Sequence, residues 1–272
     1  MATTFKEHEL EGWTAKAGAY GDYFGTATAH IAMPLLDAAC VGPGMRLLDV
    51  ACGPGYVAGA GAARGADALG VDFAPTMVEQ ARKRYPAVRF ETGDAEALAF
   101  DEGAFDAVTC AFGIGHFADP DKAIREALRV LRPGRRYAFS WWCSNDKHEF
   151  FGLVYNAIAM HGNVDVPLPP APPFARFSDP EESRRTLAAA GFIDVRLGEV
   201  SLHYDLPTPQ AVIESVERAG VRTAMVLALQ TKEARGRIDR AIIESASRFG
   251  HGGGLRFAFP AIVASGMKPF AR

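Results

Sequence analysis

Asp49 lies near the end of a short apolar run, Leu47–Val50, and the glycine-rich sequence Cys52-Gly53-Pro54-Gly55 follows it almost at once. The next residues, 57 to 63, are small and apolar and can form a helix. A strand, a tight glycine turn and a helix make a pocket for a nucleotide-type ligand, because glycine lets the ligand approach the backbone where a Cβ atom would block it. We therefore expect a cofactor-binding turn that contains Asp49, Ala51, Gly53 and Gly55.

Two kinds of cofactor fit such a turn. The pattern Gly53-x-Gly55-x-x-Ala58, with Asp72 about 20 residues further on, satisfies the fingerprint of dinucleotide-binding enzymes. However, Asp49 would place a negative charge beside a pyrophosphate, and Pro54 removes an N–H group that should bind it. S-adenosylmethionine carries an ammonium and a sulfonium group, which a carboxylate attracts. The turn therefore favours S-adenosylmethionine, with a nicotinamide-dependent oxidoreductase as the weaker alternative.

Further motifs follow in a fixed order. The full set is Leu48-Asp49-Val50-Ala51-Cys52-Gly53-Pro54-Gly55, Gly70-Val71-Asp72-Phe73, Gly93-Asp94-Ala95-Glu96, Phe105-Asp106-Ala107-Val108 and Arg129-Val130-Leu131-Arg132-Pro133-Gly134. With these motifs, over about residues 45–143, the chain resembles the class I S-adenosylmethionine-dependent methyltransferases, and within them the ubiquinone/menaquinone-biosynthesis-like branch. The resemblance implies methyl transfer to a small, apolar, aromatic or quinone-like acceptor with an oxygen, nitrogen or carbon nucleophile. A protein that binds S-adenosylmethionine without transferring its methyl is an open alternative, since one fold hosts many functions.

Acidic residues end two of the expected strands, and each has two interpretations. Asp72 can accept hydrogen bonds from ribose hydroxyls, or it can cap the helix that starts near Pro75. The resemblance implies that Asp94 binds the adenine amino group while Ala95 offers an N–H; otherwise Asp94 caps the next helix. Met77 packs either on the adenine or in the core. The remaining residues expected at the cofactor are Phe73, Gly93, Ala111 and Phe112.

His116 belongs to the loop 110–117 and can accept a proton near neutral pH. It is our candidate for a catalytic base; the alternatives are a wall of the acceptor pocket or a hydrogen bond to a loop carbonyl. We also expect Tyr20 and Trp141 to line the acceptor pocket, because aromatic residues gather near the strand ends and in the flanking segments. Asn145-Asp146 suggests a Mg²⁺ site, but the other acidic ligands are not recognisable, so we expect no metal.

These side chains need a scaffold, and the chain pattern indicates one. Short apolar segments alternate with helical ones from 45 to 142, which is typical of a parallel sheet with helices on both faces. We expect helices between the strands, with Glu96 as a solvated helix residue. The predicted fold class is α/β: a Rossmann-like, doubly wound, mostly parallel seven-stranded sheet. Its first five strands are expected at 46–51, 68–72, 89–92, 104–111 and 136–142.

The flanking segments are expected to cover the ligands within a single domain. Residues 1–44 form an N-terminal helical lid over the cofactor-binding core, residues 45–143. Residues 144–272 complete the sheet and carry helical insertions that form a substrate cap. We expect these insertions at 149–161 and about 208–248, and the last strand at 261–267.

The composition limits the partners. A net charge of −3 and a pI near 6.2 give no positive field for nucleic acid, so we expect a small-molecule acceptor instead. No run approaches the ~20 apolar residues of a membrane span, so no integral membrane segment is expected. Four scattered cysteines, and the lack of a signal-peptide pattern, favour the cytoplasm. The sequence does not indicate an oligomeric state.

Overall fold

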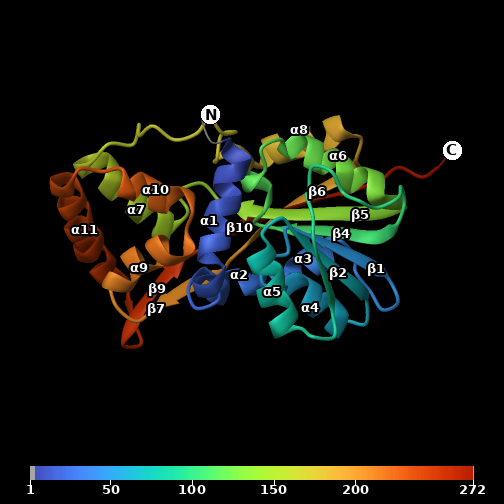
Figure 1. The fold of residues 1–272 in the computed structure, drawn as a ribbon, viewed down its shortest axis with the longest axis horizontal. Helices are drawn as coiled ribbons and strands as arrows, with labels where there is room; N and C mark the ends of the chain where they lie inside the picture. Colours follow the sequence, from blue (N-terminus) through green and yellow to red (C-terminus); the bar gives the residue numbers. More distant parts are fainter. Residues whose placement is uncertain (1–3, 272) are drawn as a thin grey trace.

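The sheet that carries the predicted site lies in the larger of two lobes (Figure 1). In the computed structural model, which describes residues 4–271, this sheet has seven strands in the order β3-β2-β1-β4-β5-β10-β6. Strands β1 to β5 are parallel, whereas β10 is antiparallel to both β5 and β6. The strands are β1 (Arg46–Val50), β2 (Asp67–Asp72), β3 (Arg89–Thr92), β4 (Phe105–Ala111), β5 (Leu131–Trp142), β6 (Ile193–Val200) and β10 (Ala261–Met267). Because the order reverses between β1 and β4, a ligand crevice is expected at the carboxyl ends of these two strands.

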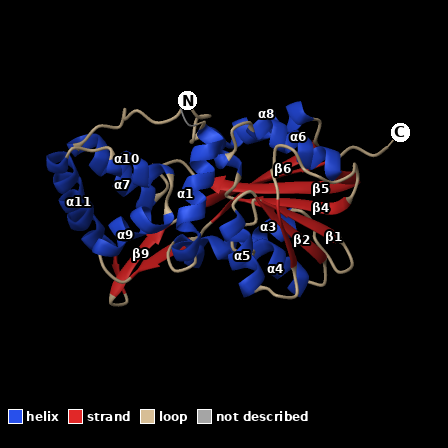
Figure 2. Cartoon of the chain, in the orientation of Figure 1, coloured by secondary structure: helices blue, strands red, loops and turns tan. Residues whose placement is uncertain are grey.

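Helices cover both faces of the sheet (Figure 2). One face carries α3 (Ala32–Ala38), α4 (Tyr56–Ala63) and α5 (Pro75–Arg84), and the other carries α6 (Pro120–Val130) and α8 (Pro180–Ala190). Strands β1 and β4 are buried almost throughout, as strands between two helical layers must be. The ends of α8 follow local signals: Asp179 caps its first turn, and Gly191 ends it in the left-handed conformation.

The smaller lobe is built from the segments between β5 and β6 and between β6 and β10. Its helices are α7 (Glu149–His161), α9 (Gln210–Ala219), α10 (Arg222–Ala228) and α11 (Lys232–Ala246). A small antiparallel sheet, in the order β7-β9-β8, completes it with β7 (His203–Leu206), β8 (Gly250–His251) and β9 (Gly254–Ala258). Phe150, Tyr204, Phe257 and Phe259 are fully buried here, and they are continuous with the core of the larger lobe.

Helices α1 (Phe5–Tyr20) and α2 (Phe24–Thr28) lie between the two lobes (Figure 1). Thr4 and Glu7 form a capping box that starts α1. This helix packs on α5 of the larger lobe and on α9 of the smaller one. Gly12 lies close to Val221, the residue before α10, because an added Cβ atom there would lie 2.5 Å from Cγ1 of Val221. Helix α1 therefore bridges the lobes.

The predicted fold class is confirmed, and α7 and β10 have the predicted bounds. Two local expectations are wrong. Residues 93–104 form turns and an isolated bridge between Asp94 and Ala97 rather than a helix. Glu96, expected to be solvated, is 8% exposed. Sequence analysis also missed the small sheet, because strands as short as β8 show no alternating pattern. Short 3₁₀ turns at Ala29–Ile31, Ile114–His116, Arg176–Ser178 and Ser247–Phe249 complete the structure.

Candidate active site

The chain turns sharply after β1 through three residues with left-handed backbone conformation. Their φ angles are 53° at Ala51, 50° at Gly53 and 84° at Gly55. A Cβ atom at Gly55 would lie 2.7 Å from Cζ of Phe90, so packing requires glycine there. A Cβ atom at Gly53 would meet no atom of the described residues within 4 Å. The turn therefore has a packed side at Gly55 and an open side at Gly53.

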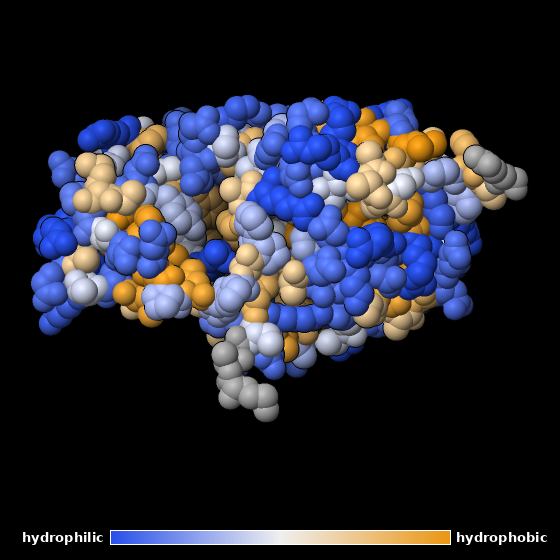
Figure 3. Space-filling model, turned by 90° about the horizontal axis from the view of Figure 1, so that it is seen from above, coloured by the Kyte–Doolittle hydropathy of each residue, from blue (hydrophilic) through white to orange (hydrophobic). Residues whose placement is uncertain are grey.

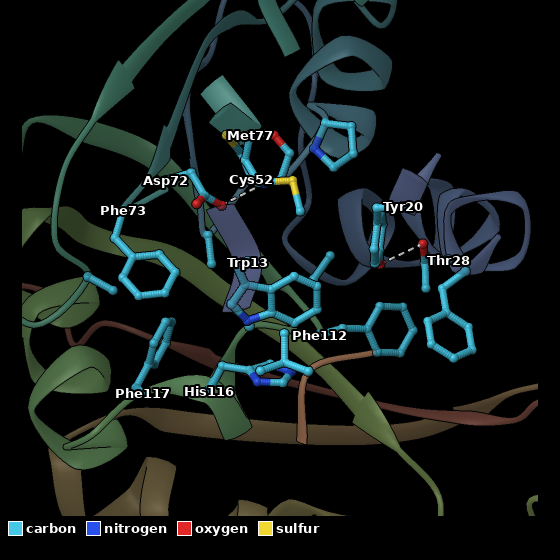
Figure 4. Close-up of a pocket in the computed structure, with 18 of the residues that line it drawn as sticks. Trp13, Tyr20, Thr28, Cys52, Asp72, Phe73, Met77, Phe112, His116 and Phe117 are labelled. Atoms are coloured by element: carbon cyan, nitrogen blue, oxygen red, sulfur yellow. Dashed lines mark hydrogen bonds between the residues drawn. The ribbon is translucent and has the colours of Figure 1, made fainter. Parts of the chain in front are cut away.

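A cavity begins at the open side of this turn and continues between the lobes. Seen from above in Figure 3, the surface is hollowed between the smaller lobe and the rest of the molecule. In Figure 4, Asp72 and Met77 lie at one end of the cavity and Trp13 and His116 lie toward the other. Of the predicted residues, those that line it are Tyr20, Ala51, Gly53, Asp72, Phe73, Met77, Gly93, Asp94, Ala95, Ala111, Phe112 and His116.

Asp72 sits at the end of β2 and is only 6% exposed. Its Oδ2 accepts a hydrogen bond from the N–H of Gly53 at 2.8 Å, and its Oδ1 accepts one from Ala74 at 2.9 Å. Burial raises the pKa of Asp72 to about 6, although both backbone hydrogen bonds oppose the shift. Helix α5 has Ala74 as its N-cap residue, so Asp72 does not act as that cap. Its carboxylate instead joins the glycine turn to the start of α5 at the cavity wall.

Asp49 does not line the cavity, which corrects the expectation of direct cofactor contact. It is 1% exposed, below the glycine turn. Its Oδ2 accepts the N–H of Ala58, one of the free donors of the first turn of α4, at 3.1 Å. Its Oδ1 accepts the hydroxyl of Thr109 at 3.0 Å. Burial raises the pKa of Asp49 to about 7. Asp49 therefore holds α4 against β4, and Gly55, which packs on Phe90, likewise supports the turn without lining the cavity.

The loop after β3 is covered by α1. Nζ of Lys6 lies 2.6 Å from Oδ2 of Asp94 and 3.3 Å from Oε2 of Glu96. The other oxygen of Glu96, Oε1, accepts hydrogen bonds from the N–H groups of Ala118 and Asp119 at 2.9 and 3.2 Å. Lys6 therefore contacts Oδ2 of Asp94, the residue whose carboxylate the resemblance assigns to the adenine amino group.

His116 lies in the 3₁₀ turn after β4 and faces α1. Its Nδ1 is 2.8 Å from Oε2 of Glu9, and Nε1 of Trp13 donates to the same oxygen at 3.0 Å. Glu9 is only 2% exposed. An ionised carboxylate can only accept, so the contact favours a proton on Nδ1 of His116, and in the neutral imidazole the lone pair is then on Nε2. Nε2 makes no hydrogen bond within residues 4–271.

Aromatic side chains form the wall beside His116. Phe112 has a φ of 56°, a conformation that is uncommon outside glycine and is often found at functional sites. Its ring stacks on Trp142 with 3.9 Å between centroids. Trp142 lines the cavity, whereas Trp141, the predicted residue, does not. Trp141 is 1% exposed and donates from Nε1 to the carbonyl of Phe174 at 3.0 Å. The correction follows from strand geometry, because neighbours on β5 point to opposite faces.

Tyr20 lies at the junction of α1 and α2 and borders the cavity (Figure 4). Its hydroxyl is 3.1 Å from Oγ1 of Thr28. Burial raises the pKa of Tyr20 well above its usual value, so the phenol is neutral and available as a polar but uncharged group.

Lys6, Trp142 and Arg222 line the cavity but were not predicted to, and neither was Glu9, which contacts His116. Lys6 and Glu9 had a detectable signal, because the spacing 6, 9, 13 puts them on one helix face with Trp13, an aromatic residue of the expected lid. Arg222 had none. In the described part of the chain no group of three or more His, Cys, Asp and Glu side chains is arranged to hold a metal ion. The same residues contain no helix with the length and hydrophobicity needed to span a bilayer.

The end of the cavity at β1 and β2 suits a nucleoside that carries positive charge. Gly53 leaves room at the backbone, and the buried carboxylate of Asp72 has a raised pKa that hydrogen-bond donors or a cation would lower. The crevice also lies at the switch point of the sheet. This arrangement defines a nucleotide-binding α/β enzyme.

Comparison with known proteins identifies the family. The model of a methyltransferase domain matches residues 48–139. A demethylmenaquinone methyltransferase of Thermus thermophilus is 38% identical over 179 residues, which cover 60% of this chain and 77% of the relative. One of Renibacterium salmoninarum is 42% identical over 100 residues, which cover 37% of this chain and less than half, 42%, of the relative. The chain belongs to the class I S-adenosylmethionine-dependent methyltransferases, in the menaquinone-like branch, and S-adenosylmethionine is its cofactor.

Solved structures agree on the fold. The YcgJ protein of Bacillus subtilis superimposes with a TM-score of 0.55 at 22% identity, covering 89% of this chain and 99% of that one. The [4+2]-cyclase SpnF superimposes with a TM-score of 0.52 at 19% identity, covering 89% of this chain and 82% of that one. Since a cyclase shares the fold, the acceptor and its chemistry must be argued from the site.

Proposed function

We propose that this enzyme transfers the methyl group of S-adenosylmethionine to a small, largely apolar aromatic acceptor of the quinone type. The observation that carries the proposal is the continuity of one cavity from the glycine turn to His116, with aromatic walls at its second end. These walls are Trp13, Phe112, Trp142, Phe151 and Phe174. Flat aromatic side chains favour a flat aromatic ligand. Two relatives are named demethylmenaquinone methyltransferase, and this name supports the same class of acceptor.

The cofactor would be held at the end near β1 and β2. It supplies a methyl group on a positively charged sulfur. Asp72 would accept hydrogen bonds from the ribose hydroxyls, and Gly53 would let the ligand approach the turn. Met77 and Phe73 would border the adenine, with Asp94 and Ala95 at its polar edge once Lys6 moves aside or shares the oxygen. The residues of this chain thus align the ligand, and most of the rate enhancement would come from that alignment.

His116 would act as the base, and Glu9 would position it. The acceptor must lose a proton during or after attack on the methyl, and Nε2 of His116 carries the lone pair that can take it. Glu9 fixes the proton on Nδ1 and would stabilise the imidazolium that results. Glu9 does not line the cavity, so it would act through His116 and not on the acceptor itself.

The flanking segments would exclude water. Residues 1–44 provide α1 and α2, which lie over the cavity, and residues 144–272 provide Phe151, Phe174 and Thr223 from the cap. In this proposal residues 1–44 act as the lid, residues 45–143 as the cofactor-binding core and residues 144–272 as the cap. A closed site prevents solvent from competing with the acceptor for the methyl.

The test is turnover of S-adenosylmethionine with a labelled methyl against a fractionated extract, followed by mass spectrometry of the labelled product. The proposal expects an aromatic hydroxyl or quinol compound to gain the label. His116→Gln should then reduce turnover about 10²–10⁴-fold with little change in cofactor affinity. Glu9→Gln should shift the pH profile of turnover, because a neutral amide holds the imidazole less firmly in its charged form. Full turnover of His116→Gln from pH 6 to 9 would refute the role of His116 as a base. Labelling of an aliphatic product would refute the proposal of an aromatic acceptor.

A further inference from the structure

Arg222 is the first residue of α10 and its side chain forms part of the cavity wall. Its guanidinium lies over the ring of Phe174, 5.8 Å from the centroid. Among residues 4–271 no carboxylate oxygen lies within 4.0 Å of it, and it donates no hydrogen bond. Arg222 is half-buried, so its guanidinium keeps part of its hydration, and an anionic group of a bound ligand would supply the partner that the described residues do not.

Two other cations at the cavity or in the same lobe pair with carboxylates. Lys6, the second cation of the cavity wall, contacts both Asp94 and Glu96. Arg235 of α11, in the same lobe, pairs with Glu217 and Asp239. Arg222 differs from Lys6 because it has no carboxylate partner among residues 4–271, and it borders the cavity, where a bound molecule can reach it.

The position of Arg222 is on the acceptor side of the cavity. The ring of Phe174 contacts both Arg222 and His116, whose centroid is 5.6 Å away. Thr223, the next residue, also lines the cavity, and its Oγ1 is 3.0 Å from the hydroxyl of Tyr155. His116 in turn lies toward the opposite end of the cavity from Asp72 (Figure 4). Arg222 and His116 thus flank one ring-lined space.

We propose that Arg222 binds an anionic oxygen of the acceptor, so that the natural acceptor is an acidic aromatic molecule with a phenolate, enolate or carboxylate group. This inference rests on the proposed function. A guanidinium is always charged and presents donors in a planar fork, which suits a carboxylate and also binds a single phenolate oxygen. Such a contact would select ionised acceptors over neutral ones. If the oxygen belongs to a phenol or an enol, Nε2 of His116 would take its proton and Arg222 would then hold the resulting anion.

The test is calorimetric titration of the full-length protein, saturated with S-adenosylhomocysteine, with matched aromatic ligands. One pair is 2-naphthoate and its neutral analogue 2-naphthamide. The other is 4-nitrophenolate and its neutral methyl ether, at about pH 8 where the phenol is ionised. Wild type should bind the anion of at least one pair about tenfold or more tightly than its neutral partner. The pair that shows the preference distinguishes a carboxylate from a phenolate. Equal affinities within both pairs would overturn the proposal.

Variants assign the effect to the residue. Arg222→Gln should lose most of the preference for the anion while its affinity for the neutral ligand stays unchanged. Arg222→Lys should keep part of the preference, since the charge remains and the fork is lost. Arg240→Gln removes an exposed arginine of α11 that does not line the cavity, and it should behave as wild type. A preference that persists in Arg222→Gln would overturn the proposal.

Affinity for S-adenosylhomocysteine separates this inference from the proposed function. Arg222→Gln should bind it as wild type does, which also shows that the variant is folded. A loss of that affinity would mean that Arg222 pairs with the carboxylate of the cofactor, and the inference would be wrong while methyl transfer could stand. Failure of wild type to methylate any aromatic acceptor would count against the proposed function, whatever the naphthoate result.

Discussion

The affinity for S-adenosylhomocysteine should rise with pH, because Asp72 must be ionised to accept two hydrogen bonds from the ribose. Burial raises the pKa of this carboxyl group to about 6. About a tenth of the ligand-free protein then has Asp72 ionised at pH 5, and about nine tenths at pH 7. If the complex contains only the ionised form, the affinity should increase about tenfold over this interval. S-adenosylhomocysteine suits the measurement because it lacks the sulfonium charge, so Asp49 should contribute little.

The same shift affects the stability of the ligand-free protein. The pKa of Asp72 is higher in the folded than in the unfolded state, so the proton stabilises the fold. This contribution is complete below about pH 4 and is lost as the pH rises through 6, with a size of about 3 kcal/mol. Ligand binding should therefore raise the melting temperature more at pH 7 than at pH 5.

Isothermal titration calorimetry at pH 5, 6 and 7 measures this dependence directly. Asp72→Asn keeps the shape of the side chain but cannot titrate, so its affinity should be low and independent of pH. Asp67→Asn is the matched control, because Asp67 lies at the other end of β2, with a side chain that is 58% exposed and contacts Arg89. A flat profile in the folded wild type, or the same slope in Asp72→Asn, would refute the assignment of Asp72 to the ribose.

Three further predictions follow from other parts of the structure. His148 is buried and caps α7 through Nδ1, and burial lowers its pKa to about 3. The neutral imidazole therefore stabilises the fold, and this contribution is complete above about pH 6.5 and is lost as the pH falls toward 3. Between pH 7 and 5 the melting temperature of wild type should therefore drop more than that of His148→Gln, and equal drops would contradict the burial argument. Gly12→Val should push α1 away from Val221 and reduce methyl transfer at least tenfold while the fold stays intact. Gly18→Ala on the same helix should be neutral, because an added Cβ there meets no described atom within 4 Å. Normal turnover of Gly12→Val would show that methyl transfer does not need α1 packed against Val221. Dialysis against EDTA should leave methyl transfer unchanged, and restoration of a lost activity by Mg²⁺ would reveal a metal requirement.

The sequence determined the cofactor-binding core, because the signals for it are local. The apolar run before Asp49, the glycines of the turn and the proline at the start of α5 act over a few residues, so they can be read without knowing the fold. For the same reason the bounds of α7 and β10 were predicted correctly. The loop after β3 was an exception: its acidic residues were expected on a helix, whereas contacts with α1 and with Ala118 hold them in turns.

The tertiary structure decided which side chains reach the cavity. Trp141 and Trp142 are equivalent in the sequence, and only the pairing of β5 with β4 and β10 determines that Trp142 faces the ligand. Glu9 and His116 are 107 residues apart and meet because α1 crosses the carboxyl end of the sheet. Arg222 gave no local signal, since its environment is made by Phe174 and by the lobe around it. The predicted cofactor residues all lie between 49 and 112, with Lys6 of α1 added by packing, whereas the predicted acceptor end is built from segments that only the packing of the two lobes brings together.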